Sequence, residues 1–425
     1  MSMFELDEKE IEALVGAVAV AGGRSGEAPP LREYFARATW TAIAEPGDRF
    51  AWSLIDALGA FEALTVLVEG RSAEVVARRL AESGIETVPP LDDLAKALAR
   101  WSPRVNPNGT MLSLREAARY DARLLVPSDS LWPGGLDDLG QFAPIALWVR
   151  GTDAAVSSLG RGIALVGARA ATGYGEHVTM EASAGLVDRG YSIVSGAAYG
   201  IDGMAHRAAL ASSGETIAFL AGGVDRFYPS GHDALLSRIV EKGAVMSEVP
   251  CGTAPTKWRF LQRNRLIAAA SRATIVLEAG WRSGSLNTAG HASTLGRPLG
   301  AVPGPVTSAA SAGCHRLIRD FQATCVTNAD EMAELAPLGA LTAPTGYGDV
   351  GLGRNPTQPP GPPGVQQQSA SVMRLLDAVS ARSQRAATDI AARCGLSLDH
   401  VRALLGVLEL EGRVREEERG WVRVQ

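Results

Sequence analysis

Two strands joined by a helix, with a glycine turn after each strand, most strongly constrain the fold of this 425-residue chain. An apolar run at residues 163–166 ends at Gly167, a segment with helical spacing follows, and a second apolar run at residues 193–194 ends close to Gly196. In a parallel sheet both turns emerge at the carboxyl edge, where backbone amides beside a helix start can bind an anion. Two such turns side by side indicate a phosphate-containing ligand.

The alternation of strands and helices continues through residues 162–340. The apolar runs that predict strands are residues 163–166, 191–195, 216–220, 244–248, 273–278, 299–302 and 325–327. Strands that alternate with helices pair in parallel through right-handed crossovers, so the predicted fold class is α/β with a doubly wound, Rossmann-like sheet. Glycines follow strand after strand, and such a row of turns suits a repeating polyanion at least as well as one cofactor.

Composition divides the rest of the chain into four parts. Residues 1–123 have amphipathic patterns that predict a helical N-terminal module, and residues 124–161, which contain several prolines, predict a connector packed on the core. Residues 341–370 are rich in proline, glycine and glutamine, which is typical of a linker. Residues 371–425 show three helical segments and two short strand candidates, the order of a winged-helix domain. Acidic residues in its third helix and hairpin favour a protein contact or an intramolecular role over DNA binding.

Positive charge is concentrated in one stretch, although the formal net charge of −5 argues against a uniformly basic nucleic-acid binder. Residues 249–277 contain no Asp or Glu but carry basic side chains at Lys257, Arg259, Arg263, Arg265 and Arg272. Trp258 and Phe260 lie among them, and this combination lets a single strand place phosphates on cations and bases on aromatic rings. Taken alone, the residue types favour a plainer interpretation, in which the aromatics are core residues and the arginines form a solvated helix face.

Missing motifs disfavour several classes of function. The chain has no GxGxxG after the first strand, no GxxxxGK[ST] and no HExxH, which disfavours ordinary dinucleotide and ATP chemistry. Its cysteines are scattered, so we expect reduced core thiols at Cys251, Cys314, Cys325 and Cys394, no metal and no cofactor. No apolar run reaches the roughly 20 residues that a membrane span needs. We therefore expect a cytoplasmic protein with no membrane span.

Two pairs of titratable residues also allow a catalytic interpretation. Asp202 and His206 lie four residues apart on a predicted helix, as an acid and base pair would. We favour the alternative that Asp202 caps the helix and His206 packs behind it. Glu248 and Glu278 end predicted strands, where we favour a role in holding neighbouring loops, although the sequence does not separate this role from catalysis.

Eight motifs within residues 124–335 narrow these alternatives. In order they are VGARAATGYG, SGAAYGIDGMAH, LAGGVDRFYP, SEVPCGTAP, RFLQRNRLIA, EAGWRSGSLNTA, GRPLGAVPG and AGCHRLI. Their order and spacing closely resemble the DNA-processing protein A family, also called DprA or Smf. The resemblance implies an extended Rossmann-like domain with a helical N-terminal module and a C-terminal winged helix. It also implies a homodimer that binds and protects incoming single-stranded DNA without catalysis and loads the RecA recombinase in natural transformation, competence and DNA recombination.

The resemblance further implies which residues bind DNA. It assigns two phosphate-contacting loops, a cation with a stacking aromatic, and a basic pair. In that order the matching positions are Gly167 with Arg169, Ser195 with Gly196, Lys257 with Phe260, and Arg263 with Arg265. Asn264, between the two arginines, is expected to fix the loop through backbone hydrogen bonds instead of contacting DNA.

Three positions depart from the family pattern. Ala168 replaces a serine of the first loop and loses a hydroxyl that could contact phosphate. Leu261 replaces a proline after Phe260, so we expect a less rigid loop there. Asn287 replaces an aliphatic residue, and the sequence gives no physical reason for that change.

An enzyme that processes a nucleotide is the alternative class of function. Rossmann-like phosphoribohydrolases of the Lys-decarboxylase-like type resemble this domain and cleave nucleoside monophosphates in a similar crevice. Those enzymes carry a PGGxGTxxE signature, whereas this chain has EAGWRSGSLNTA. The difference favours the non-catalytic DNA binder.

Overall fold

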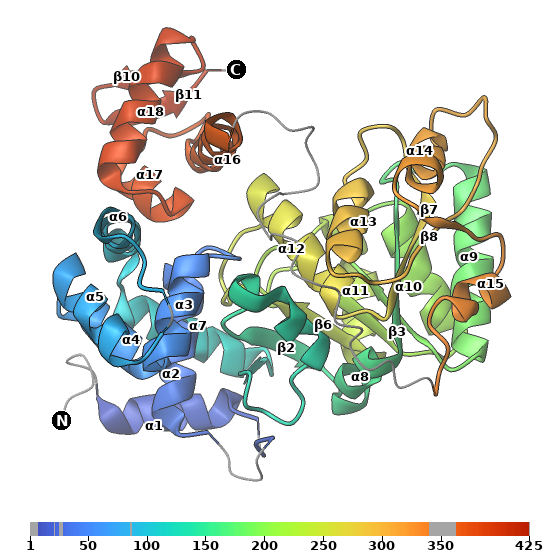
Figure 1. Ribbon diagram of the computed structural model, residues 1–425, viewed down its shortest axis with the longest axis horizontal. Coiled ribbons are helices and arrows are strands. Elements are labelled where there is room, and N and C mark those ends of the chain that lie inside the picture. The colour runs from blue at the N-terminus through green and yellow to red at the C-terminus, as the bar shows by residue number, and fades with distance from the viewer. Residues whose placement is uncertain (1–6, 21, 25–28, 86, 340–362, 425) are drawn as a thin grey trace.

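A nine-stranded sheet forms the centre of the computed structural model, which describes residues 7–20, 22–24, 29–85, 87–339 and 363–424 (Figure 1). The strand order is β1-β2-β6-β5-β4-β3-β7-β8-β9. Its parallel part consists of β3 (Gly162–Gly167), β4 (Ser192–Ser195), β5 (Thr216–Phe219), β6 (Ala244–Ser247), β7 (Ala273–Glu278), β8 (Leu299–Ala301) and β9 (Thr324–Cys325). These strands match the apolar runs, so the doubly wound α/β fold is confirmed.

The order of strands reverses at β3, which is where such a sheet offers a crevice for a ligand. β3 pairs with β4 on one side and with β7 on the other. Strands β4, β5 and β6 are added in one direction, and β7, β8 and β9 in the other. The loops after β3 and β4 therefore diverge at the carboxyl edge, beside the loop after β7.

Alternating side chains of β3 serve two hydrophobic layers, as expected for a strand buried on both faces. Ile163 and Leu165 pack in the layer that includes α9, α10 and α15, and Ala164 and Val166 pack in the layer of α12, α13 and α14. The helices around the sheet are α8 (Asp153–Ser157), α9 (Gly173–Asp188), α10 (Ile201–Ala211), α11 (Asp233–Lys242), α12 (Lys257–Ala269), α13 (Ser285–Thr294), α14 (Ala312–Asp320) and α15 (Ala329–Glu334).

Residues 124–161, expected to be a connector, contribute strands to the central sheet. They include β2 (Leu147–Gly151), which pairs antiparallel with β6, while β1 (Arg123–Leu125) pairs antiparallel with β2. A 3-10 segment, Gly134–Phe142, lies between the two strands. The prolines of this region fall outside the strands. Because of these prolines the sequence predicted an irregular connector, whereas the segment extends the sheet.

The N-terminal module is helical, and part of it packs directly on the sheet. Its helices are α1 (Glu8–Val18), α2 (Leu31–Ile43), α3 (Arg49–Leu58), α4 (Ala60–Val68), α5 (Ala73–Glu82), α6 (Leu91–Trp101) and α7 (Pro107–Arg119). Residues of α1 and α7 share a hydrophobic cluster with Trp148 of β2. Helices α2 to α6 enclose a separate core, in which the rings of Trp40 and Trp101 meet edge to face at 5.2 Å.

The C-terminal domain is a winged helix, as the sequence predicts. It consists of α16 (Pro363–Ala378), α17 (Ala387–Cys394), α18 (Leu398–Leu410) and an antiparallel hairpin of β10 (Val414–Glu417) and β11 (Gly420–Arg423). Helix α16 begins inside the stretch expected to be a linker, and residues 341–362 of that stretch lie outside the described residues. Figure 1 shows this domain above the N-terminal helices, with α17 next to α6.

One buried carboxylate, Glu45, links the N-terminal module, the central domain and the winged helix. It accepts hydrogen bonds from Arg104, which follows α6, and from Arg259 of α12, at 2.9 Å for the latter. Arg374 of α16 adds a third positive charge, and its own side chain donates to the carbonyls of Cys394 and Gly395. We call these four residues the Glu45 cluster. Because Arg104 also donates to the Ala392 carbonyl of α17 at 2.7 Å, the cluster fastens the winged helix to the other two domains.

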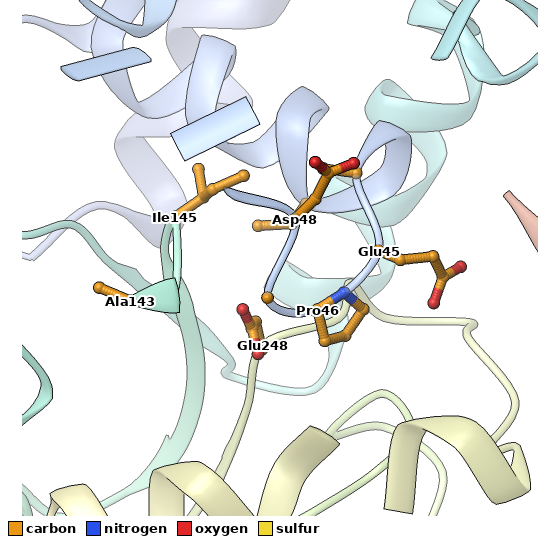
Figure 2. A pocket seen from close by; sticks show the side chains of 9 residues that line it. Glu45, Pro46, Asp48, Ala143, Ile145 and Glu248 are labelled. Atoms are coloured by element: carbon orange, nitrogen blue, oxygen red, sulfur yellow. The ribbon is translucent and has the colours of Figure 1, made fainter. Parts of the chain in front are cut away.

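The loop that carries Glu45 lies on the central domain. Figure 2 shows Glu45, Pro46 and Asp48 between α2 and α3, next to Glu248 at the end of β6. The space enclosed there is only about 10 Å³, room for a single water at most. Asp48 caps α3 by accepting from the amides of Phe50 and Ala51. The loop is therefore held at both ends by polar groups.

The expectation of buried cysteines holds for three of the four. Cys251, Cys314 and Cys394 are buried, but Cys325 is exposed because β9 is the edge strand of the sheet. Within the described ranges, no individual helix is long and apolar enough to cross a membrane; only α3 and α4 taken together, across a bend of 112°, reach that length and composition.

Candidate nucleic-acid interface

A cleft of about 510 Å³ opens at the switch point of the sheet. Its walls come from the loop after β3, the first turns of α12, the loop after β7 and the start of α13. Arg169, Arg263 and Arg282 are among its lining residues, and Asp202 is the one acidic residue that lines it. The cleft therefore carries an excess of positive charge in a chain whose net charge is negative.

Gly167 allows the first loop to turn tightly into the cleft. A Cβ atom at this position would lie 2.5 Å from Ile201 and 2.8 Å from the Glu278 carbonyl, so no larger residue fits. The loop is fixed by two backbone hydrogen bonds, from Ala168 to the Glu278 carbonyl (2.7 Å) and from Ile201 to the Ala168 carbonyl (3.1 Å). Arg169 follows and is exposed at the cleft.

Phe260 and Arg169 meet across the cleft from different elements. Phe260 lies on α12, whose N-terminus is capped by Thr256, and its half-buried ring faces the Arg169 guanidinium at 5.3 Å. The Tyr228 ring lies 5.5 Å from the Phe260 ring. Lys257, one turn before Phe260, is exposed. The structure thus places Arg169 against Phe260, with Lys257 one turn away on the same helix, and the Tyr228 ring packs beside Phe260 although Leu261 replaces the family's proline.

Ser195 and Gly196 are buried behind the cleft instead of lining it. The Ser195 hydroxyl donates to the Leu165 carbonyl at 2.6 Å. The Gly196 amide donates to the Asp202 carboxylate at 3.2 Å, and its carbonyl accepts from Arg263 at 2.7 Å. These polar groups already have partners within the protein, and of this loop it is Ala198 that lines the cleft.

The basic pair on α12 is split between two roles. Arg263 lines the cleft, but it is buried and donates to the carbonyls of Gly196 and Phe219. Burial lowers the pKa of Arg263 to about 10, while the nearby Asp202 carboxylate opposes that shift. Arg265 lies in the interior and forms a two-pronged ion pair with Glu248, at 2.7 and 2.8 Å. Arg263 therefore shapes the cleft wall, and Arg265 ties α12 to the end of β6.

Asp202 and His206 are both buried and hydrogen-bonded within the protein. Gly200 caps α10, and Asp202, in the first turn, holds the amides of Gly196 and Ala198, so its expected capping role becomes a loop-holding role. Burial raises the pKa of Asp202, against the lowering effect of Arg263 and of the amides. His206 is fully buried, with Nδ1 2.6 Å from the Thr216 hydroxyl, and burial lowers its pKa to about 3.

Of the other two carboxylates, Glu278 holds a loop, as the sequence interpretation favoured, whereas Glu248 pairs with a helix residue. Glu278 accepts from the hydroxyl of Thr172 at 2.6 Å and from its amide at 2.9 Å, which fixes the chain just before α9. Glu248 accepts from Arg265. Among the described residues, no group of three or more His, Cys, Asp or Glu is placed to hold a metal ion.

Asn264 and Asn287 are hydrogen-bonded to each other. The Asn264 side chain donates to the Asn287 side-chain oxygen at 3.1 Å and to the Gly284 carbonyl at 3.4 Å. Both side chains are buried, so this bond joins α12 to α13 where an aliphatic residue at position 287 would leave Asn264 with one partner fewer. The departure from the family pattern thus has a structural reason.

One part of the cleft wall was indicated by the sequence only through its glycines. The loop from Gly280 to Ser285 lines the cleft and leads into α13, whose N-terminus has no side-chain cap. The Gly and Ser run within EAGWRSGSLNTA was the available signal for an anion-binding helix start. Trp258, by contrast, lies under α16, where its amide donates to Asp377 at 3.3 Å and Arg374 lies over its ring.

A Rossmann-like core with a basic, glycine-lined cleft and an attached winged helix defines a class of multidomain proteins suited to polyanions. The family profile described as DNA recombination-mediator protein A matches residues 123–337, and the profile described as DprA winged helix domain matches residues 356–418. The chain belongs to the DNA-processing protein A family, DprA or Smf, as its motifs indicated.

Individual relatives agree with this assignment. A Mycobacterium tuberculosis protein that carries the DNA processing protein DprA name is 42% identical over 313 residues, which cover 71% of this chain and 77% of the relative. Protein Smf of Escherichia coli is 40% identical over 217 residues, covering 51% of this chain and 57% of Smf. The X-ray structure of DNA processing protein A from Streptococcus pneumoniae aligns with a TM-score of 0.55 at 27% identity, covering 71% of this chain and 97% of that one.

Proposed function

We propose that this protein binds single-stranded DNA in the cleft without catalysis, and that it protects the strand and loads RecA onto it in natural transformation or recombination. The observation that carries the proposal is the Phe260 ring 5.3 Å from the Arg169 guanidinium, on the helix turn that also carries the exposed Lys257. An aromatic ring among cations stacks a base while the cations hold the flanking phosphates, in any sequence. We propose that the protein acts in the cytoplasm as a homodimer, which would present two such clefts.

The buried carboxylates support a binding role over nucleotide hydrolysis. A phosphoribohydrolase needs an acidic group that is free to act on the substrate. Glu278 and Glu248 each accept two hydrogen bonds from neighbouring groups, and Asp202 holds the amides of the second loop. Release of free base from nucleoside monophosphates, lost in a Glu278→Gln variant, would instead support the enzyme alternative.

Single substitutions in the cleft should weaken single-strand binding in two distinguishable ways. Phe260→Ala should cost about 1–3 kcal/mol of binding free energy, roughly 5- to 150-fold in Kd, with an unchanged salt dependence because no charge is lost. Arg169→Ala and Lys257→Ala should each lower the slope of log K against log salt by about 0.7. Titration of labelled oligo-dT across a salt series measures both effects.

Lys242→Ala is the matched control for the charge variants. Lys242 is exposed at the end of α11, just before β6 begins, and so lies at the opposite edge of the sheet from the cleft. The Lys242→Ala variant should bind oligo-dT with the same affinity and salt dependence as the wild type. Cleft variants that behaved like this control, or duplex DNA that bound more tightly than oligo-dT, would contradict the proposed site.

The RecA step is tested separately. Assembly of RecA on a protected single strand should be faster with the wild-type protein and slower with Phe260→Ala, because the strand must first be held. Equal rates with and without the wild-type protein would contradict the loading role and leave the binding role intact.

A further inference from the structure

Trp281 is exposed in a way that the other tryptophans of this chain are not. All eight lie within the described residues; Trp40, Trp101, Trp132 and Trp148 are buried, and Trp52, Trp258 and Trp421 are partly buried. Trp281 has 55% of its surface exposed. A large aromatic ring left in water gives up the burial that makes tryptophan stabilising, and such rings are common where a partner stacks.

The exposed ring is held from behind by a cation. The Arg316 guanidinium lies 5.0 Å from the Trp281 ring centroid, and the same guanidinium lies 5.4 Å from the Phe321 ring. Arg316 is on α14, and α14 is fastened to the end of β7 because the Gly313 amide donates to the Ala279 carbonyl at 2.7 Å. Trp281 and its supporting arginine therefore belong to one rigid part of the domain.

Trp281 also sits beside the cleft. Gly280 and Arg282, on either side of it in the chain, both line the cleft that contains Phe260. Arg282 is exposed and could meet a phosphate between two stacked bases. The nearest strand-end carboxylate, Glu278, is buried and bonded to Thr172, so it does not oppose a polyanion there.

We propose that Trp281, supported by Arg316, is a second base-stacking site for the strand that Phe260 holds, with Arg282 contacting the intervening backbone. The inference rests on the proposed function, because it extends the path of the strand across the cleft from α12 to the loop after β7. Single-strand sites combine several aromatic platforms with a basic track, which makes binding tolerant of sequence. Trp281 and Arg282 are absent from the DNA-binding positions that the family resemblance implies, and this path gives both of them a ligand.

Stepwise-shortened oligo-dT separates the two stacking sites. Trp281→Ala should weaken binding of the longer oligonucleotides by roughly 5- to 150-fold, and this loss should vanish once the strand is too short to reach from Phe260. Trp281→Phe should retain most of the affinity because it keeps an aromatic face. Phe260→Ala should weaken binding at every length. Leu112→Ala, at an equally exposed apolar residue of α7, is the control that should change nothing.

Fluorescence gives an independent readout. The indole of Trp281 should be quenched when a base stacks on it, so oligo-dT should quench the wild-type protein more than the Trp281→Phe variant. If Phe260→Ala loses affinity while Trp281→Ala binds all lengths like the wild type, the second site is wrong and the proposed function stands. If neither variant changes binding, the proposed function fails as well. If Trp281→Ala changes the oligomeric state but not the affinity, the ring is a protein contact and the inference is overturned.

Discussion

Arg265→Ala is expected to lower the free energy of unfolding of the central domain by about 3–5 kcal/mol and to leave the oligo-dT affinity of the folded protein unchanged. We expect this large loss of stability because both partners are buried: the Arg265 side chain is 4% exposed and that of Glu248 is 10% exposed. Removing the guanidinium would leave the carboxylate buried without a counter-charge. The carbonyls of Phe142 and Gln262 would also lose a donor.

Hydrogen exchange of the core strands measures this loss even where the three domains unfold separately. The double variant Arg265→Ala with Glu248→Ala should lose less stability than the single variant, because no unpaired charge remains. Arg238→Ala, at an exposed arginine of α11, should change the stability by no more than about 0.5 kcal/mol. A stable Arg265→Ala variant with weakened DNA binding would instead restore the ligand contact that the family resemblance implies.

Glu45→Gln should release the winged helix from the other domains and destabilise their junction by about 3–5 kcal/mol. The Glu45 side chain is 9% exposed, and those of Arg104 and Arg259 are 7% and 12% exposed. An amide in its place leaves these two arginines, and the nearby Arg374, without the charge that compensates them. Faster hydrogen exchange in α12 and α17, and a larger radius of gyration in solution scattering, would report the release.

The same carboxylate predicts how acid should act on the junction. Burial alone would raise the pKa of Glu45, but Arg259, Arg104 and Arg374 outweigh it and hold the pKa well below its ordinary value of 4.5. A lowered carboxyl pKa stabilises the folded form above the ordinary value, and that stability is lost as the pH falls toward the folded pKa. The wild-type junction should therefore weaken steadily below about pH 4.5, whereas the Glu45→Gln variant should lack this dependence.

Asp93→Asn is the matched control for the Glu45 variant. Asp93 pairs with Lys96 at 3.6 Å on the surface of α6, with side chains that are 42% and 72% exposed. Exposed pairs of this kind contribute about 0–1 kcal/mol, so the control should behave like the wild type at neutral pH. If Glu45→Gln matched this control in both exchange and pH response, the Glu45 cluster would not hold the domains together.

The fold was largely predictable because each buried parallel strand leaves a local trace in the sequence. The run at residues 163–166 followed by Gly167 needs no distant information, and neither does the hairpin of the winged helix. The antiparallel strand β2 is different, because its partner β6 lies almost a hundred residues later and the segment before it is interrupted by prolines. Only the folded sheet shows that this segment belongs to it.

The candidate site was predictable in part for the same reason. Arg169, Lys257 and Phe260 lie in local motifs, and the structure places Arg169 against Phe260, with Lys257 one helical turn away. The burial of Arg265 depends on Glu248, and the covering of Trp258 depends on α16, more than a hundred residues further along the chain. Similar residues of the basic stretch therefore have different roles, because each role depends on a partner that lies elsewhere in the chain.

The exposed position of Cys325 makes the natural chain chemically addressable at a single thiol. Burial raises the pKa of Cys251 and of Cys314 to about 12 and also raises that of Cys394, so these sulfurs stay protonated and shielded from reagents. Cys325 alone of the four is open to solvent, on the edge strand three places from β3. A maleimide dye would therefore label one defined point of the sheet, without cysteine replacement, for single-molecule observation of a strand entering the cleft.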